Sequence, residues 1–424
     1  MQIKLAVLFL LFFSIVPNLG FFTIPAFLII CLITFILLLS VFRADSFLQS
    51  DTDSKLTILP LVLLIFYSSI YYGGLYQNPY SINLGNALIF SVAILVIINH
   101  FNKNILKKII LPFIVFSYIF LSIWTLIQSP QPRVDSFIQQ KEAPLKLIQG
   151  INPYNSVYTK VYSNVEPNYF GYLPFSFIYH LPFVFAFSDP RFSIIISNLI
   201  IAVVIFKLFK LKNRREESYP FIAAFLFLPR SFYILEHMYL DPVIFSFFLL
   251  FIYSYIKKRY SLSTLLLSLF FSFKQHLIFL LPLFVKHTSK KFHTFKHTLI
   301  FLLPFFLPLL FLLINPSAFL KNIVFFFNPQ HIPAPVLNSL SLTTLFTRYM
   351  IKSPSIYLNV IFFILFLFFF LLIIFKRKTF LIPKLAVSLI LFNFFMYHSF
   401  FNHYYLVALF LLFDILCNYL KIRV

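Results

Sequence analysis

Apolar stretches separated by short polar clusters follow one another along almost the whole chain. Most are about 20 residues long, which is the length a helix needs to cross the hydrocarbon core of a bilayer. They are continuous rather than alternating with polar residues, which indicates helices and not the strands of a barrel. Backbone polar groups find no partner in lipid, so helices and closed barrels are the structures that can span it. The pattern predicts an all-α, polytopic integral membrane helical bundle.

Composition strengthens this prediction. The chain of 424 residues is 61% hydrophobic and 11% charged, whereas a soluble domain carries about 25% charged residues. A net charge of +22 also occurs in nucleic-acid-binding proteins. Here, however, Lys and Arg lie in short clusters between apolar runs, as in the cytoplasmic loops of membrane proteins. We therefore expect membrane lipids, and no nucleic acid, as partners. The two cysteines, Cys31 and Cys417, lie within apolar runs and predict neither a disulfide nor a metal site.

The basic clusters also predict orientation, because cytoplasmic loops are richer in Lys and Arg than outer loops. This rule places both termini in the cytoplasm and gives about 14 membrane segments in the plasma (inner) membrane. A large extracytoplasmic loop then covers 128–189 and carries interfacial helices. The clusters assigned to the cytoplasmic side lie at 103–108, 207–215, 257–259, 286–296, 376–378 and 421–423.

Parity between these clusters identifies two unusual segments. Of the apolar segments 171–188 and 190–209, one alone can cross if the chain is to be inside at Lys207. We predict that 171–188, which contains Pro174 and Pro182, lies along the outer interface as an amphipathic helix. Too few residues separate Arg259 from Lys286 for two ordinary spans, which predicts a pair of short helices that turn within the membrane, near a cavity.

Two ionisable residues stand out in this topology. Asp135 follows the outward span and lies at the membrane–water boundary, where a partly desolvated carboxylate can act as a general base. The alternative is a solvated loop acid beside Arg133. Lys274 lies at the turn of the short helices, where a charge is costly and marks a functional site. The alternative is a side chain that snorkels to the interface.

The residues after Asp135 contain an ordered set of motifs. At Asp135, Gly150-Ile151-Asn152-Pro153-Tyr154, Tyr172-Leu173-Pro174, Phe273-Lys274-Gln275-His276 and His403-Tyr404-Tyr405, the sequence resembles the C-type (GT-C) superfamily of membrane glycosyltransferases. The similarity is greatest to the branch that uses polyprenol-phosphate mannose. In that family a loop aspartate follows an outward span, a Gly-x-Asn-Pro-Tyr turn comes next, and a lysine faces the lipid phosphate. Two departures are that Leu173 replaces a proline and that about four spans, instead of one, precede the aspartate.

The resemblance implies Asp135 as the catalytic residue. Glu236 and Asp241 can bind sugar hydroxyls or, with water, a divalent cation; the alternative is that Asp241 caps a helix beginning at Pro242. No other cofactor is expected, and no spacing of His, Cys and Glu predicts zinc. An acidic loop at 45–53 contains an Asp-x-Asp pattern, and its predicted cytoplasmic side favours a solvated loop over a metal site. The substrate-binding candidates are Lys274, His276, Asn152, Tyr154, Tyr172, Glu236, Asp241, Arg348, His403 and Tyr404.

The implied activity is inverting transfer of a hexose, with mannose expected, from a polyprenyl-phosphate carrier to an extracytoplasmic glycan, lipid or protein acceptor of the cell envelope. Residues 1–108 would form N-terminal transmembrane helices, an added module, and 109–424 the GT-C-like catalytic core. The chain has six glycines and no glycine-rich nucleotide-binding loop, which favours a lipid-linked donor. The alternatives are a flippase or transporter of lipid-linked saccharides, a polymerase of such saccharides, and a scaffold without chemistry.

Overall fold

The computed structural model describes residues 2–42, 54–101, 108–161, 167, 169–288, 294–324, 338–351, 356–376 and 379–422. Throughout these ranges the regular elements are helices, and an isolated β-bridge pairs Phe21 with Ser339. The prediction of an all-α fold is confirmed for the described chain.

Within the ranges given above, seven helical segments are long and apolar enough to cross a membrane. Further apolar helices of 10–17 residues accompany them. A multi-pass membrane protein is therefore supported, while the total of about 14 segments stays a prediction. The seven segments are α2 (Ile24–Phe42), α4 (Pro79–Phe101), α6 (Ile110–Gln128), α9 (Phe192–Leu211), the continuous run Phe295–Ile314, α19 (Ile356–Phe375) and α21 (Phe401–Tyr419).

The chain packs as two compact units. Unit 1 comprises Met1–Pro60, Phe279–Thr288 and Phe326–Val424, and unit 2 comprises Leu61–Ile278 and Ser289–Phe325. Helix α3 (Ser54–Ile70) continues from the first into the second.

Unit 1 is arranged around α21, whose residues are buried along nearly the whole helix. It packs against α1 (Gln2–Ile15) and α20 (Leu381–Phe395). The unit also contains α2, α14 (Leu281–His287), α18 (Leu342–Phe346) and α19. An ion pair joins α1 to α21, with Lys4 Nζ 2.5 Å from Asp414 Oδ2 and both side chains buried. A charge is expensive at such a place, so each of these residues requires the other.

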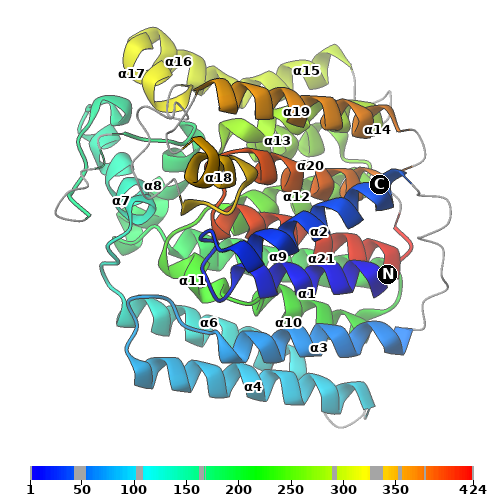
Figure 1. The fold of residues 1–424 in the computed structure, drawn as a ribbon. Coiled ribbons are helices and arrows are strands. Elements are labelled where there is room, and N and C mark those ends of the chain that lie inside the picture. Colours follow the sequence, from blue (N-terminus) through cyan, green and yellow to red (C-terminus); the bar gives the residue numbers. More distant parts are fainter. Residues whose placement is uncertain are drawn as a thin grey trace. The chain divides into compact units, whose positions relative to one another are not determined.

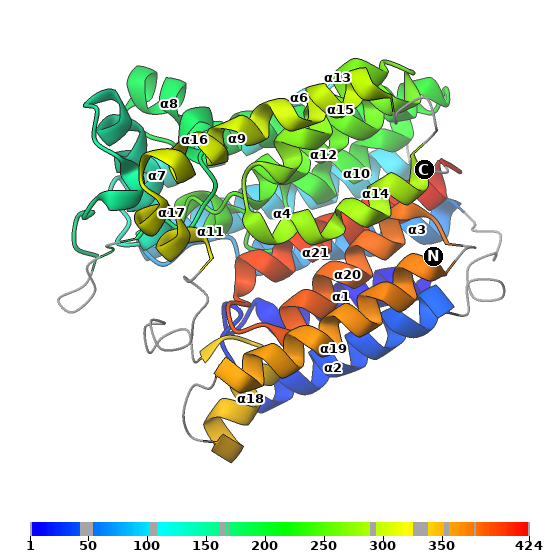
Figure 2. The same ribbon diagram turned by 90° about the horizontal axis from the view of Figure 1, so that it is seen from above.

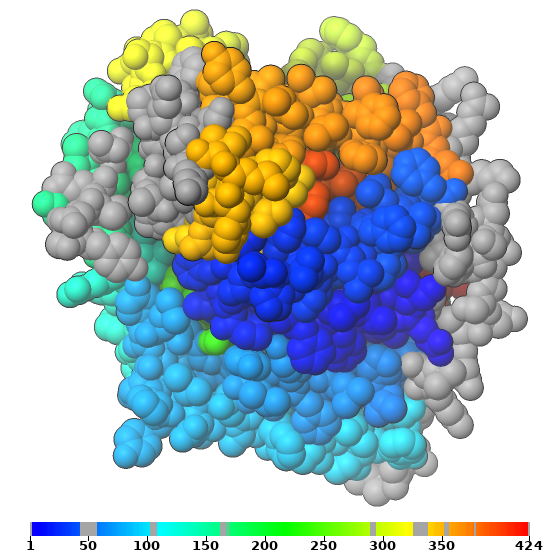
Figure 3. Space-filling view, in the orientation of Figure 1, coloured from blue at the N-terminus to red at the C-terminus, as the bar shows by residue number. Residues whose placement is uncertain are grey.

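Unit 2 has α12 (Asp241–Ile256) at its centre, packed against α9 and α13 (Tyr260–Phe271). The helices α7 (Asp135–Ile148), α8 (Phe175–Phe187) and α17 (Pro316–Ile323) lie together at one end of these long helices (Figures 1 and 2). The remaining helices are α10 (Ser218–Leu226), α11 (Ser231–Glu236), α15 (Phe295–Leu302) and α16 (Phe306–Ile314). The surface of α4, light blue in Figure 3, exposes Leu84, Phe90 and Ile98, as expected of a lipid-facing helix.

Helices form in both unusual segments. Segment 171–188 contains α8, which buries Phe177 and Val184 and exposes Phe185 and Phe187. Helix α13 ends at Phe271, and a 3-10 helix, Gln275–Leu280, leads into the short α14, so the chain turns beside Lys274. The lie of both elements in the bilayer remains a prediction.

The predicted sidedness can be tested by cysteine labelling. Gln149→Cys should react with a membrane-impermeant maleimide added to intact cells, and Lys212→Cys should react only after the cells are opened. Both positions are exposed, so burial would not explain a lack of reaction. Gln149 is used because its neighbour Gly150 has φ +75°, which strains other residues. Cys31 and Cys417 are first replaced by Ala. The reverse labelling pattern would place Asp135 on the cytoplasmic side and contradict the topology.

Candidate functional site

Asp135 is the first residue of α7, not a residue within an irregular loop. The preceding residue, Val134, is extended and caps the helix, and a carboxylate in the first turn is favoured by the helix dipole. Its Oδ1 accepts a hydrogen bond from Ser136 N (2.7 Å) and its Oδ2 accepts one from Tyr169 OH (2.8 Å). The side chain is half-buried, which is the partly desolvated state expected for it.

Lys274 does not snorkel, because it is buried in an ion pair. Its Nζ lies 3.0 Å from Asp241 Oδ1, and the two side chains are 5% and 0% exposed. The helix begins one residue earlier than predicted, because Asp241 is itself the first residue of α12 and Leu240 occupies the N-cap position. Asp241 is instead the counter-ion of Lys274. Removing one partner of such a pair leaves an uncompensated buried charge.

The loop that carries Tyr172 lies against both Asp135 and the turn of Lys274, because Tyr169 OH donates to Asp135 Oδ2 (2.8 Å) and Leu173 N donates to Phe273 O (3.1 Å). Burial, followed by the negative charges of Asp135 and Asp241, raises the pKa of the Tyr172 phenol. Both carboxylates therefore act electrostatically on one hydroxyl group. We call Asp135, Tyr172, Asp241 and Lys274 the carboxylate–lysine site.

The loop that carries Tyr172 is held by a buried aromatic core. Tyr154 is 3% exposed, its ring meets Phe170 and Phe319 edge-on, and its hydroxyl donates to Tyr172 O (2.7 Å). Asn152 caps the 3-10 helix Pro153–Asn155 through its side-chain oxygen, which accepts from Tyr154 N (3.0 Å). Both residues are predicted to contact substrate, and this stays a prediction. In the structure Tyr154 supports Tyr172 through its hydroxyl, and Asn152 supports Tyr154 through its side-chain oxygen.

Glu236 has a different place from the one expected. Its carboxylate is fully buried and accepts from Leu75 N (2.6 Å, Oε2) and Tyr76 N (3.2 Å, Oε1). Burial raises the pKa of Glu236, and the hydrogen bonds from the two backbone amides oppose this change. Glu236 therefore anchors the segment between α3 and α4 to α11.

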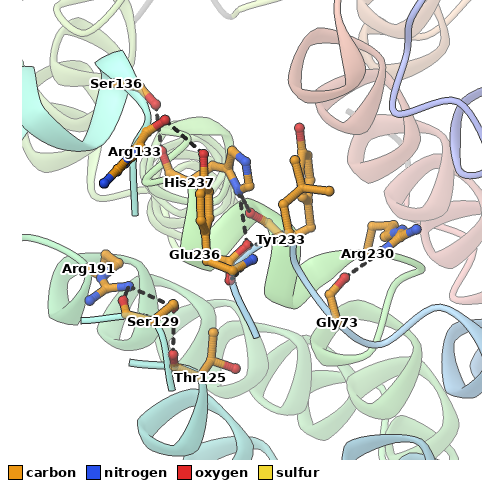
Figure 4. Close-up of polar contacts among 12 residues, drawn as sticks. Gly73, Thr125, Ser129, Arg133, Ser136, Arg191, Arg230, Tyr233, Glu236 and His237 are labelled. Atoms are coloured by element: carbon orange, nitrogen blue, oxygen red, sulfur yellow. Dashed lines mark hydrogen bonds and ion pairs between the residues drawn. The ribbon is translucent and has the colours of Figure 1, made fainter. Parts of the chain in front are cut away.

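This anchor extends to the start of α7. Arg230 Nη1 donates to Gly73 O (2.5 Å), and Ser136 Oγ donates to His237 O (2.5 Å) (Figure 4). Burial lowers the pKa of His237 to about 3, so its ring is neutral. Tyr76 OH donates to Arg133 O (2.8 Å), close to Asp135. The α3–α4 connection and α11 thus fix the turn that precedes Asp135.

The fit of Gly74 against Glu236 gives a test of this anchor. A Cβ at Gly74 would lie 1.7 Å from Glu236 Oε2. We expect Gly74→Ala to lower the free energy of unfolding by about 2 kcal/mol. In the background of Glu236→Ala, where the carboxylate is gone, the same substitution should cost less than about 1 kcal/mol. The measurement is a double-mutant cycle of denaturant unfolding in detergent. An equal cost in both backgrounds would show that the carboxylate is not what Gly74 accommodates.

The remaining candidates have other described neighbours, and their roles as substrate-binding residues stay predictions. His276 is half-buried in the 3-10 helix that follows Lys274. Arg348, His403 and Tyr404 belong to unit 1. There Arg348 lies over the Phe22 ring (5.8 Å), the rings of His403 and His398 are 5.8 Å apart, and the buried Tyr404 donates its hydroxyl to Leu340 O.

The described residues contain no group of three or more His, Cys, Asp and Glu side chains that could hold a metal ion. A cation shared by Glu236 and Asp241 has no support, because Glu236 binds backbone amides and Asp241 binds Lys274. The acidic residues Asp45, Asp51 and Asp53 lie outside the described residues.

Three residues of the site were not expected from the sequence. Tyr169 binds Asp135 directly. Asn322, on α17, accepts from Phe170 N (2.6 Å) and donates to Tyr154 O (2.9 Å). Tyr239 is half-buried, and desolvation, followed by the charges of Tyr233 and Asp135, raises its pKa. Tyr169 follows the Asn-Pro-Tyr motif and Tyr239 follows Glu236. The abundance of tyrosine in these two segments was the sequence feature that could have indicated them.

Comparison with known proteins returns no matching family model and no matching curated protein.

Proposed function

We propose that this protein is a membrane glycosyltransferase that moves a hexose, with mannose the first candidate, from a polyprenyl-phosphate carrier to an acceptor on the extracytoplasmic side. The observation that supports it most is that one short loop, 169–173, contacts both the half-buried Asp135 and the turn of the buried Lys274. Tyr169 OH donates to Asp135 Oδ2 (2.8 Å), and Leu173 N donates to Phe273 O (3.1 Å). Base catalysis and stabilisation of a leaving phosphate need these two groups near one another.

In the proposed reaction Asp135 takes the proton of the acceptor hydroxyl while that oxygen attacks the anomeric carbon. The bond from the anomeric carbon to the phosphate oxygen breaks, and polyprenyl phosphate leaves with the electron pair. Attack opposite to the leaving group inverts the configuration. One oxygen of the Asp135 carboxylate accepts a hydrogen bond from Tyr169 and the other accepts one from the Ser136 amide. A carboxylate offers about four lone-pair sites, so two of them are not used by these donors. It can therefore still accept the proton.

Lys274 supplies the positive charge for the leaving phosphate. An ammonium group has three N–H donors, and Asp241 receives a hydrogen bond from Lys274 Nζ. A phosphate is a stable anion that needs no proton from the protein, so a cation is sufficient. In a buried place this interaction is stronger than in water.

A reconstituted assay tests the proposal. The purified chain in liposomes is supplied with radiolabelled polyprenyl-phosphate mannose or glucose and with envelope extract as a source of acceptor. Transfer of label to the extract, with release of polyprenyl phosphate, is the expected result. Donor that stays intact with every acceptor fraction would contradict the proposal.

A flippase is the second candidate, because the ion pair of Lys4 with Asp414 is a further buried charge pair between apolar helices, and charged groups in several helices are typical of transporters. The same liposomes separate the two functions. A flippase moves intact donor between leaflets without cleaving the sugar–phosphate bond, and its activity does not depend on an acceptor.

A further inference from the structure

We infer that Tyr169 is a positioning residue for Asp135, holding its carboxylate in the orientation in which it serves as the base. This inference rests on the proposed function. The contact is direct, since Tyr169 OH donates to Asp135 Oδ2 at 2.8 Å. Burial, followed by the charge and the hydrogen bond of Asp135, raises the pKa of Tyr169. The phenol therefore keeps its proton and remains the donor.

A neutral donor suits a general base better than a cation does. Among the described residues no Lys, Arg or His forms an ion pair with Asp135. A cation would stabilise the ionised carboxylate strongly and make it a weaker base. The Tyr169 phenol holds one carboxylate oxygen of Asp135 in place without neutralising the negative charge. The orientation of the whole carboxylate, and so of its remaining lone pairs, is then fixed by the same contact.

Tyr169 is itself held rigidly. The next residue, Phe170, is fully buried in the aromatic core, and its amide donates to Asn322 Oδ1 (2.6 Å). Asp135 and Tyr169 thus form one polar cluster at the edge of the aromatic core.

Several other titratable groups surround this cluster. The charge of Asp135 contributes to raising the pKa of the Tyr172 and Tyr239 phenols. The ion pair of Asp241 with Lys274 has no net charge. Other charged or titratable groups lie on α7, on the turn before it and on the segments packed against it. They are Arg133, Lys141, Glu142, Lys146, Tyr154, Tyr179, His180 and Arg191, whose guanidinium lies over the Phe137 ring (4.8 Å). Since none of these donates to the Asp135 carboxylate, a change at the phenol should be seen directly in its behaviour.

Tyr169→Phe removes the hydroxyl and keeps the ring. We expect kcat for sugar transfer to fall about 10-fold, as for loss of a hydrogen bond to a charged group, with KM for the donor changed by less than about 2-fold. The acid limb of the pH–rate profile should move to higher pH, because the ionised carboxylate loses a bond that favours it.

Tyr158→Phe is the matched control. Tyr158 is a buried phenol of the same loop, and its hydroxyl donates to Pro153 O (2.7 Å) rather than to Asp135. It should keep the normal pH profile. An unchanged profile in Tyr169→Phe, or the same loss in both variants, overturns the inference while leaving the proposed function intact.

A second measurement does not depend on activity. Difference infrared titration, with the Asp135 band identified by Asp135→Asn, should show the carboxylate protonating at higher pH in Tyr169→Phe than in the unmodified protein. Identical titrations would overturn the inference even if the unmodified protein transferred no sugar, which would be a failure of the proposed function alone.

Discussion

Asp135→Asn should lower the rate of sugar transfer by about 10³-fold, which is within the range for loss of a general base. Asparagine has nearly the same shape: its oxygen can accept from Ser136 N, and its amide nitrogen can donate to the Tyr169 oxygen, which donates to Asp135 in the unmodified protein. It cannot take the proton of the acceptor hydroxyl. The variant should therefore fold normally and bind donor normally, and the loss should lie in kcat.

The measurement is transfer of label from polyprenyl-phosphate hexose in liposomes, with folding checked by gel filtration in detergent. Glu142→Gln is the control. Glu142 lies on the same helix, two turns later, and accepts from Thr159 N (3.2 Å) at the protein surface. It should retain transfer within about 2-fold. Normal transfer by Asp135→Asn would refute the role of Asp135 as the base.

The second large effect concerns the buried pair of Lys274 and Asp241. Lys274→Met leaves the Asp241 carboxylate buried and uncompensated, which costs about 3–5 kcal/mol. Asp241→Asn likewise leaves the Lys274 ammonium buried without its counter-ion. We expect both single variants to be strongly destabilised and inactive. A low yield of folded protein by itself would not show what Lys274 does in the reaction.

The double variant Lys274→Met/Asp241→Asn separates stability from function. Replacing both members of a buried ion pair by neutral groups is often neutral for stability, so the double variant should regain most of the unfolding free energy measured in denaturant. It should remain inactive and bind polyprenyl phosphate weakly, because the cation for the leaving group is gone. Restored transfer in the double variant would show that the pair is purely structural.

Among the N-terminal helices, α3 and α4 have a supporting structural role for the candidate site. The segment after α3 is bound by Glu236 through Leu75 N and Tyr76 N, and Tyr76 OH reaches the turn before Asp135. The α3–α4 pair was expected to belong to a separate module. Through these contacts it supports the position of the proposed base.

The sequence by itself determined the helical membrane architecture, because apolar runs and basic clusters are local properties that the bilayer imposes on the chain. It also singled out Asp135 by its motif and Lys274 by the cost of a charge in an apolar run. It could not give their partners. Tyr169 is 34 residues from Asp135, Asp241 is 33 residues from Lys274, and Leu75 is 161 residues from Glu236.

Only the tertiary structure decided those pairings. A periodic pattern reports which face of a helix is apolar, but not which distant segment that face meets. Glu236 is an example: its sequence position suggested a ligand-binding carboxylate, and in the structure it accepts hydrogen bonds from two backbone amides. Tyr154 lies in a motif typical of a substrate site and yet is part of the loop core. A buried polar group requires a hydrogen-bond or ion-pair partner. The fold provides that partner from a segment that is distant in the sequence and close in space.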